Sequence, residues 1–268
     1  MPFYTDTHCH LDFPAFNADR EEVINRAQAA SLSLIINPGI DLPTSQIAIL
    51  LSKTYPGFIF AAIGFHPNYG EAWLPDSLET LKSLAIQDSV LAIGEIGLDY
   101  YRHYTPREQQ RLMFTEQLAL AQELSLPVII HNRDATFDLM TILEDWVSAL
   151  PANSPLKLRP GVLHSFSADL QTALHAIKLH FYIGISGPIT FRNAQDQKDL
   201  VAQLPLESIL LETDAPYLTP HPYRGRRNEP AYVPFIATEI AHLHHCTPDE
   251  LAQITYRNAT RLFDLKLT

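Results

Sequence analysis

Side chains of the types that bind metal ions recur along this sequence, nearly all of them at the end of a short apolar run. The first are His8 and His10, which flank Cys9. Side chains two residues apart on an extended strand point to the same side, so both histidines can bind one ion while Cys9 faces the other way. The later candidates are Glu95, His131, His164 and Asp214. Their types and placement predict a metal site.

The size of this set decides between two interpretations. A single histidine after a strand is more often a hydrogen-bonded loop residue than a ligand. Here five histidines and three carboxylates fall at the same kind of position, namely His8, His10, His66, His131, His164, Glu95, Glu212 and Asp214. Imidazole and carboxylate together suit Zn²⁺, Mn²⁺ or a similar ion, and one carboxylate can bridge two ions about 3.5 to 4 Å apart. We therefore predict two divalent ions.

The elements that must position these residues alternate along the chain. Apolar runs of strand length alternate with amphipathic segments of helix length. The predicted strands are Phe3–Thr7, Ser33–Asn37, Phe58–Gly64, Val90–Gly94, Pro127–Ile130, Gly161–Leu163, Phe181–Ile185 and Ser208–Leu211. The helical patterns include Asp19–Ala30, Pro106–Leu124, Asp134–Ala149, Val233–His245 and Pro248–Phe263. Strands alternating with helices predict an α/β fold, a (β/α)8 TIM barrel, in which function lies at the C-terminal ends of the strands.

Composition agrees with one enzyme domain. The 268 residues suit a single barrel, and we predict one domain over residues 1–268. No apolar segment is long enough to span a bilayer, and the N-terminus lacks the features of a signal peptide, so a cytoplasmic protein is expected. With only Cys9 and Cys246, a disulfide framework is excluded. Nothing in the sequence indicates an obligate protein partner.

Seven blocks of sequence resemble the TatD family of metal-dependent hydrolases. They occur in order over essentially the whole chain, at residues 6–12, 93–100, 127–131, 162–167, 211–218, 223–230 and 258–263. The resemblance implies a TIM-barrel metallohydrolase, often described as a deoxyribonuclease. It also implies that His8, His10 and Asp214 bind one ion, that His131 and His164 bind a second, and that Glu95 bridges both. Glu212 matches the family too, but its role stays open.

Two ions predict a hydrolytic mechanism. Metal binding lowers the pKa of water from 15.7 toward about 7, which yields a nucleophile near neutral pH. We expect Asp214 to accept a proton as well as to bind metal, and Glu95 to take part in catalysis as the bridging ligand. The native metal, Mg²⁺, Mn²⁺ or Zn²⁺, is left open by the sequence, as is the direction in which a strand would be digested.

Charge limits the choice of substrate. The sequence has 19 Lys and Arg against 30 Asp and Glu, a net charge of −11, so a broad basic surface for duplex DNA is not expected. Contacts to only a few phosphates are still compatible with this charge. Arg133 directly follows the stretch around His131, and Arg224 lies in a loop with Arg226 and Arg227; guanidinium groups bind phosphate oxygens well. We predict that Arg133, Arg224, Tyr223 and His66 contact substrate, the aromatic ring of Tyr223 by stacking.

Three functions remain open at this point. The first is a nuclease that acts on DNA ends or on short single-stranded nucleic acid, the second is a metallohydrolase of a small ester, amide or lactone, and the third is a non-catalytic metal-binding protein. The acidic composition favours the second and the arginines favour the first. A second histidine group, His242, His244, His245 and Cys246, is better explained as a solvated helix end than as another metal site.

Overall fold

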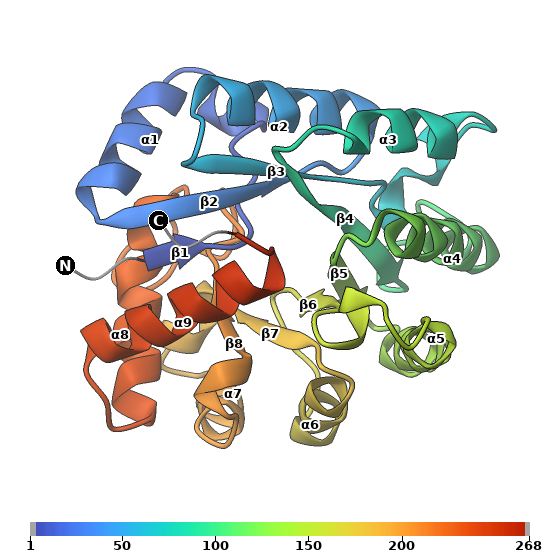
Figure 1. The fold of residues 1–268 in the computed structure, drawn as a ribbon. Coiled ribbons are helices and arrows are strands. Elements are labelled where there is room, and N and C mark those ends of the chain that lie inside the picture. The colour runs from blue at the N-terminus through green and yellow to red at the C-terminus, as the bar shows by residue number, and fades with distance from the viewer. Residues whose placement is uncertain (1–3, 266–268) are drawn as a thin grey trace.

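The computed structural model describes residues 4–265, which form one barrel of eight strands surrounded by helices (Figure 1). The strands are β1 Tyr4–Asp6, β2 Leu32–Pro38, β3 Ile59–Ile63, β4 Val90–Asp99, β5 Val128–Arg133, β6 Gly161–Leu163, β7 Tyr182–Ile185 and β8 Ile209–Leu211. They lie side by side in the order of the sequence, and each neighbouring pair is parallel. The predicted (β/α)8 barrel is confirmed.

The last strand returns to the first. The Thr7 backbone N–H donates to the Leu211 carbonyl at 3.0 Å, and the Asp214 N–H donates to the His8 carbonyl at 2.9 Å. Cys9 and Ala215 form a parallel bridge just beyond the two strands. These contacts bring the residues after β1 and after β8 together at one rim of the barrel.

Helices cover the outside of the barrel and one of its ends. They are α1 Arg20–Ala29, α2 Leu42–Thr54, α3 Ser77–Ala85, α4 Arg107–Leu124, α5 Thr136–Ala149, α6 Leu170–Lys178, α7 Gln195–Val201, α8 Val233–Leu243 and α9 Pro248–Leu262. Local sequence sets several starts. Thr247 caps α9 in a capping box, because its hydroxyl accepts from the Glu250 N–H at 3.2 Å while the Glu250 carboxylate accepts from the Thr247 N–H at 2.8 Å.

Most predicted elements lie within a residue or two of the observed ones, with two exceptions at the site. We predicted a strand over Val90–Gly94, but β4 continues to Asp99, and β5 continues past Ile130 to Arg133. Glu95 and His131 therefore lie inside strands, where we expected them just after strand ends. The apolar run stops early because inward-facing positions near the rim are polar, although the hydrogen-bonded ladder goes on. Phe3, the first residue of the first predicted strand, lies outside the described residues.

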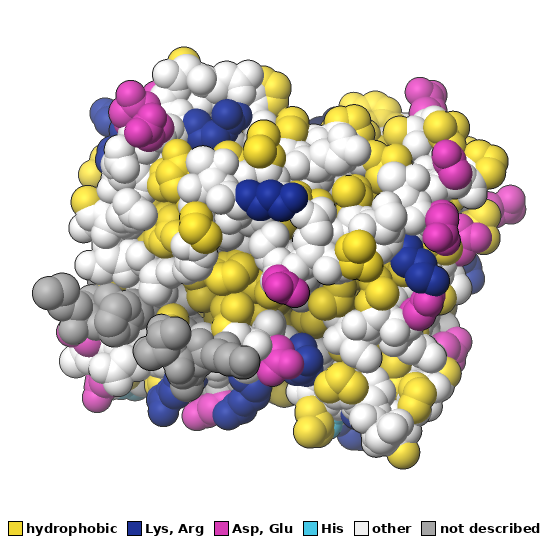
Figure 2. Space-filling view, turned by 45° about the horizontal axis from the view of Figure 1, so that its top comes forward, with side chains coloured by type: hydrophobic (Ala, Val, Ile, Leu, Met, Phe, Trp, Pro, Cys, Tyr) yellow, Lys and Arg dark blue, Asp and Glu magenta, His cyan; other side chains and the backbone are white. Residues whose placement is uncertain are grey.

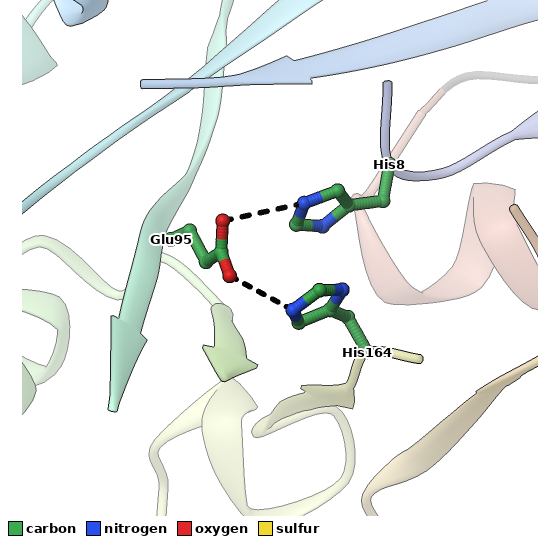
Figure 3. A group of neighbouring side chains, drawn as sticks. All are labelled: His8, Glu95 and His164. Carbon is green, nitrogen blue, oxygen red and sulfur yellow. Dashed lines mark ion pairs between the residues drawn. The ribbon is translucent and has the colours of Figure 1, made fainter. Parts of the chain in front are cut away.

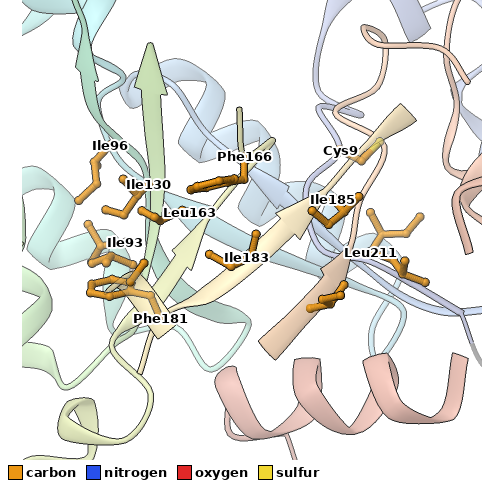
Figure 4. Packing of buried hydrophobic residues seen from close by; sticks show 14 of the residues in the cluster. Cys9, Ile93, Ile96, Ile130, Leu163, Phe166, Phe181, Ile183, Ile185 and Leu211 are labelled. Carbon is orange, nitrogen blue, oxygen red and sulfur yellow. The ribbon is translucent and has the colours of Figure 1, made fainter. Parts of the chain in front are cut away.

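Two apolar layers support the barrel. Outward-facing strand residues such as Ile130, Leu163, Ile183 and Leu211 are buried between the strands and the surrounding helices (Figure 4). A separate cluster fills the interior, where Leu34, Ile36, Ala62, Ala92, Ile129, Val162, Tyr182 and Leu210 meet Ala259, Leu262 and Phe263 from the end of α9. The helix α9 thus closes the end of the interior opposite the polar rim.

Charged side chains are thinly spread over the surface that Figure 2 shows. On the described part of this face, Lys and Arg side chains lie scattered, several of them beside Asp or Glu, and the area between them is apolar or neutral. This face therefore carries no broad basic patch over its described residues. Within residues 4–265, no helix has both the length and the apolar character needed to cross a membrane.

Candidate metal centre

The predicted ligands meet at the rim formed by the C-terminal ends of the strands. His8 and His10 follow β1, His164 follows β6 and Asp214 follows β8, whereas Glu95 and His131 belong to β4 and β5. Every one of these side chains is buried or nearly so; Glu95 is 3% exposed. Residues as far apart in sequence as His8 and Asp214 become neighbours because the Asp214 N–H donates to the His8 carbonyl and the Thr7 N–H donates to the Leu211 carbonyl.

One half of the centre consists of His8, His10 and Asp214. The two Nε2 atoms of the histidines lie 3.1 Å apart. The Asp214 Oδ1 atom is 3.8 Å from each of them. Two nitrogens and one carboxylate oxygen within 4.8 Å of one another form a group that can hold a cation.

Glu95 connects this half to a second one. Its Oε1 atom lies 2.8 Å from His131 Nδ1 and 2.8 Å from His164 Nε2. Its Oε2 atom lies 3.4 Å from His8 Nε2 and 3.5 Å from His10 Nε2. Figure 3 shows the two carboxylate oxygens turned toward different imidazoles, those of His8 and His164. The carboxylate of Glu95 therefore faces two groups of ligands at once.

The backbone of β4 is shaped to bring Glu95 inward. Its register against β5 shifts between Ile93 and Ile96, and Glu95 lies within this irregular step. Gly97 follows with a φ of 141°, and a Cβ atom there would lie 2.1 Å from the His131 carbonyl oxygen. Only glycine permits this close approach of the two strands, because any side chain would collide with the backbone of β5.

Further contacts orient the imidazoles. His10 Nδ1 lies 3.2 Å from the Pro38 carbonyl, which directs its Nε2 atom toward His8 and Asp214. His131 Nε2 lies 3.4 Å from Asp99 Oδ2. Such partners on the far nitrogen fix the ring orientation of metal-binding histidines.

Electrostatics distinguish the histidines. Burial lowers the pKa of His8 well below its usual value, and burial together with His131 lowers the pKa of His66 to about 3, so both rings are neutral and have a lone pair for a metal. Burial also disfavours the charged form of His10, but Glu95 outweighs it and raises the pKa to about 9. For His131, Asp99 and Glu95 outweigh burial and raise the pKa to about 9.

The carboxylates of the centre lack permanent positive partners. Burial would raise the pKa of Glu95, but His164, His66 and other imidazoles hold it well below its usual value. Burial raises the pKa of Asp214. Within residues 4–265, neither carboxylate forms an ion pair with Lys or Arg. Buried carboxylates surrounded only by imidazoles are a donor set that fits divalent cations.

Glu212 and His66 differ from the other rim residues. Glu212 is fully buried and accepts a hydrogen bond from the Ser165 N–H, while its Oε1 atom is 3.9 Å from His164 Nδ1. It thus supports the loop that carries His164 and belongs to no potential ligand group of the described residues. His66 Nε2 lies 3.6 Å from Glu95 Oε1, and His66, Glu95 and His131 form a further group that can hold a cation.

Two clefts open from this centre. The first has a volume of about 820 Å³ and the second about 1090 Å³, and both are lined in part by His131, Arg133, His164 and Asp214. His66 lines the second cleft. The clefts give solvent, and hence a substrate, access to the predicted ligands.

The other predicted substrate contacts lie elsewhere. The Arg224 guanidinium is 4.1 Å from the centre of the Phe191 ring, and the Tyr223 ring stacks on Tyr232 at 4.4 Å. Neither Arg224 nor Tyr223 lines the two clefts. Arg227 pairs with Asp19, with N–O distances of 2.6 and 2.7 Å, as expected for a structural arginine.

Sequence reasoning gave Asp99 no role, although it supports the centre. Besides its contact with His131, it accepts hydrogen bonds from Asn68 Nδ2 and from the Arg102 N–H, both at 2.9 Å. The signal was present in the sequence, because Glu95 and Asp99 are four residues apart and therefore face the same side of one strand. It was missed because the predicted strand ended at Gly94.

The histidines at the end of α8 form no comparable group. His244 Nε2 lies 2.9 Å from the Val201 carbonyl, a contact between neighbouring elements. Over residues 4–265, each potential metal-binding group lies at the barrel rim. This agrees with the interpretation of His242, His244, His245 and Cys246 as a helix end.

Comparison with known proteins identifies the family. Residues 5–264 match the family model described as TatD related DNase. The chain belongs to the TatD-related DNase family. The "Uncharacterized metal-dependent hydrolase YabD" of Bacillus subtilis (strain 168) is 43% identical over 259 residues, which cover 96% of this chain and 98% of that protein. The "3'-5' ssDNA/RNA exonuclease TatD" of Erwinia tasmaniensis is 38% identical, with 97% and 99% covered.

Solved structures of TatD proteins have the same fold. The crystal structure of YJJV, a TatD homolog from Escherichia coli K12, superposes with a TM-score of 0.90 at 35% identity, and 98% of each chain is covered. The predicted family and fold are thus confirmed. As a TatD protein the chain is a metal-dependent hydrolase, and the buried His, Glu and Asp groups at its rim are positioned for metal binding.

Proposed function

We propose that this TatD protein is a divalent-metal-dependent exonuclease that removes nucleotides from the ends of single-stranded DNA or RNA. The observation that carries the proposal is the position of Glu95, whose two carboxylate oxygens face two different imidazole groups at the point where two clefts meet. A relative that is 38% identical over nearly its whole length bears the name of a 3'-5' ssDNA/RNA exonuclease. We propose the same 3'-5' polarity for this chain.

The proposed ligand sets follow the two halves of the centre. His8, His10 and Asp214 would hold one ion, His131 and His164 would hold the other, and Glu95 would serve both. Divalent ions bound in this way polarise a phosphoryl oxygen and lower the pKa of water to about 7. The donor atoms of His8, His10 and Asp214 lie within 4.8 Å of one another, as do those of His8, Glu95 and His164.

Asp214 is the proposed proton acceptor. Its side chain is 15% exposed, compared with 4% for that of Glu95, so it is reached more easily from the clefts. Both clefts include Asp214 in their lining. A carboxylate in this position can take a proton from water as the phosphodiester is attacked.

Arg133 and His66 are the proposed phosphate contacts among the four substrate residues predicted from sequence. Arg133 lines both clefts, and within residues 4–265 its guanidinium pairs with no carboxylate. His66 lies deeper, beside Glu95. Arg224 and Tyr223 stay predictions, because they lie outside the two clefts.

The test uses protein stripped with chelator and reconstituted with Mg²⁺, Mn²⁺ or Zn²⁺. Each form receives end-labelled single-stranded and duplex DNA, alongside Asp214→Asn and the matched control Asp145→Asn on the exposed side of α5. We expect stepwise, metal-dependent shortening of single strands by the wild type and the control, and none by Asp214→Asn. Intact strands with every metal would contradict the proposal.

A second candidate is hydrolysis of a small ester, amide or lactone. It is favoured by the net charge of −11 and by the first cleft, which is lined by Asp169, Asp196 and Asp199. Negative surroundings disfavour a polyanion but not a neutral substrate. Turnover of aryl carboxylate esters, with oligonucleotides left intact by the same preparation, would establish this alternative.

We also propose that the protein acts in the cytoplasm and without an obligate protein partner. Support for the location comes from Cys9 and Cys246, which are free thiols as expected in a reducing compartment. Fractionation of cells that produce the tagged protein tests the location, and light scattering at micromolar concentration tests the assembly.

A further inference from the structure

The two clefts that meet at the metal centre differ in chemistry. Besides the shared residues, the first is lined by serines, amides and the carboxylates Asp169, Asp196 and Asp199. The second contains the carboxylates Glu71, Glu95 and Asp99 too, but it adds Arg102 and the aromatic rings of Phe13, Tyr69, Tyr104 and Tyr217. A nucleic-acid strand therefore meets mainly carboxylates and amides in the first cleft, and aromatic faces beside guanidinium groups in the second.

Arginines and tyrosines form a connected group at the edge of the second cleft. The Arg133 guanidinium lies 3.8 Å from the centre of the Tyr101 ring. The Arg102 guanidinium lies 5.4 Å from the same ring and 5.9 Å from that of Tyr104. Within the described chain neither arginine has an acidic partner, in contrast to Arg26, Arg111, Arg159 and Arg227. Both guanidinium groups are available to an external anion.

Three tyrosines in this cleft or beside it are largely exposed. Tyr104 and Tyr217, which line it, are 63% and 57% exposed, and Tyr101 at its edge is 52% exposed. Tyr100, the neighbour of Tyr101, shows the opposite behaviour, because it is 9% exposed and its hydroxyl donates to Asp138 at 2.7 Å. Exposed rings next to unpaired guanidinium groups offer both stacking faces and phosphate contacts.

The loop that carries Tyr101, Arg102 and Tyr104 is fixed to the metal centre. Asp99 accepts from the Arg102 N–H at 2.9 Å and lies 3.4 Å from His131 Nε2. Gln110 Nε2 on α4 donates to the Asp99 carbonyl at 2.9 Å and to the Thr105 carbonyl at 3.0 Å. The segment between Asp99 and Thr105 is therefore held at both ends, at a set position relative to the ligands.

We infer that the second cleft binds the body of a single-stranded nucleic acid, with Tyr104 and Tyr217 stacking on bases and with Arg102 and Arg133 contacting phosphates. This inference rests on the proposed function and assigns the residues that make the enzyme select single strands. Bases in a duplex are stacked on one another and paired, so their faces are not open to tyrosine rings. The acid-lined first cleft then lies on the far side of the scissile phosphate.

The first test is the dependence of KM on strand length. For the wild type, KM falls as single strands grow from two to twelve nucleotides, because longer strands reach the tyrosines. Tyr104→Ala and Tyr217→Ala each raise the KM of the 12-mer about tenfold, as expected for one lost stacking contact, with little change in kcat. The control Phe235→Ala on α8, a ring 36% exposed outside both clefts, keeps the wild-type dependence.

An abasic 12-mer separates stacking from phosphate contacts, because it has the same phosphates without bases. The wild type binds it more weakly than Tyr104→Ala binds the normal strand, because the abasic strand loses the stacking on both Tyr104 and Tyr217, and Tyr104→Ala binds the abasic strand as tightly as the wild type does. If Tyr104→Ala weakened the abasic strand as much as the normal one, Tyr104 would act through the fold and the stacking assignment would be wrong.

The arginines are tested by salt. Each phosphate contact to a single strand contributes about 0.7 to the slope of log Kd against log salt concentration, so Arg133→Gln and Arg102→Gln each lower the slope by about 0.7. The matched control Lys53→Gln on α2 removes the same charge outside both clefts and leaves the slope unchanged. An unchanged slope in both arginine variants overturns the phosphate assignment.

The outcomes distinguish this inference from the proposed function. If the wild type degrades single strands but all four variants keep its length and salt dependence, the second cleft is not the strand site although the enzyme is a nuclease. If the wild type degrades no oligonucleotide of any length yet turns over an aryl phosphate, the proposed function fails and the inference fails with it.

Discussion

The interior of this barrel has two halves that share the same strands: one is filled by apolar side chains, and the other holds the polar side chains of the metal centre. On β5, Ile129 lies in the apolar half and His131, two residues later, in the metal centre. On β8, Leu210 packs against the interior cluster, and the next inward residue, Glu212, lies at the rim. One half is closed by α9 and the other opens into two clefts. On each of these strands, the side chain that packs in the core and the side chain that lies at the rim are only two residues apart.

This division makes the two halves separable by mutation. Changes at the rim should remove activity with little effect on folding, because they replace groups that serve an ion and a substrate. Changes in the apolar half should lower stability and leave each folded molecule active. Substitutions at the boundary should do both.

The largest effect is expected at the rim. Glu95→Gln keeps the shape of the side chain but removes the charge that faces both imidazole groups, so turnover of single-stranded DNA should fall by at least about 10³. The thermal midpoint of the metal-free variant should stay within a few degrees of the wild type, as measured by circular dichroism. A variant with a tenth of the wild-type rate would show that Glu95 is dispensable.

A smaller effect, of a different kind, is expected in the apolar half. Leu210 is fully buried among the interior residues, so Leu210→Ala should lower the free energy of unfolding by about 2 to 5 kcal/mol. The rate per folded molecule should stay within about twofold, because no ligand is touched. Urea unfolding with parallel activity assays measures both, and Leu112→Ala at an exposed site on α4 serves as the control. A large loss of turnover per folded molecule would show that packing in the apolar half also determines activity at the rim.

The smallest effect is expected at the boundary, at Gly184. A Cβ atom there would lie 2.4 Å from Glu212 Oε2, so Gly184→Ala must displace the carboxylate that holds the Ser165 N–H beside His164. We expect a loss of about 1 to 3 kcal/mol in stability together with about tenfold lower turnover. The double variant Gly184→Ala/Glu212→Asp, which shortens the opposing side chain, should recover part of both. If stability fell and turnover did not, Glu212 would have a structural role only.

The sequence predicted the barrel, its strands and the six side chains that meet at the rim, because short apolar runs and the polar residues that follow them are local signals. It did not reveal that Glu95 and His131 lie within strands, since a ladder of backbone hydrogen bonds continues regardless of side-chain polarity. The role of Asp99 and the pairing of Arg227 with Asp19 also escaped it, because they depend on which loops meet in space. The chemical difference between the two clefts is likewise a property of the assembled rim.

The pairing of the first strand with the last has a consequence for protein synthesis. Thr7 and Leu211, which join β1 to β8, are 204 residues apart in the chain. At translation rates of about 5 to 20 residues per second, roughly 10 to 40 s pass between the synthesis of the two ends of this contact. During that time the nascent chain carries His8 and His10 without Asp214, so these three side chains cannot come together. The group that they form at the rim is therefore one of the last parts of the fold that can be completed.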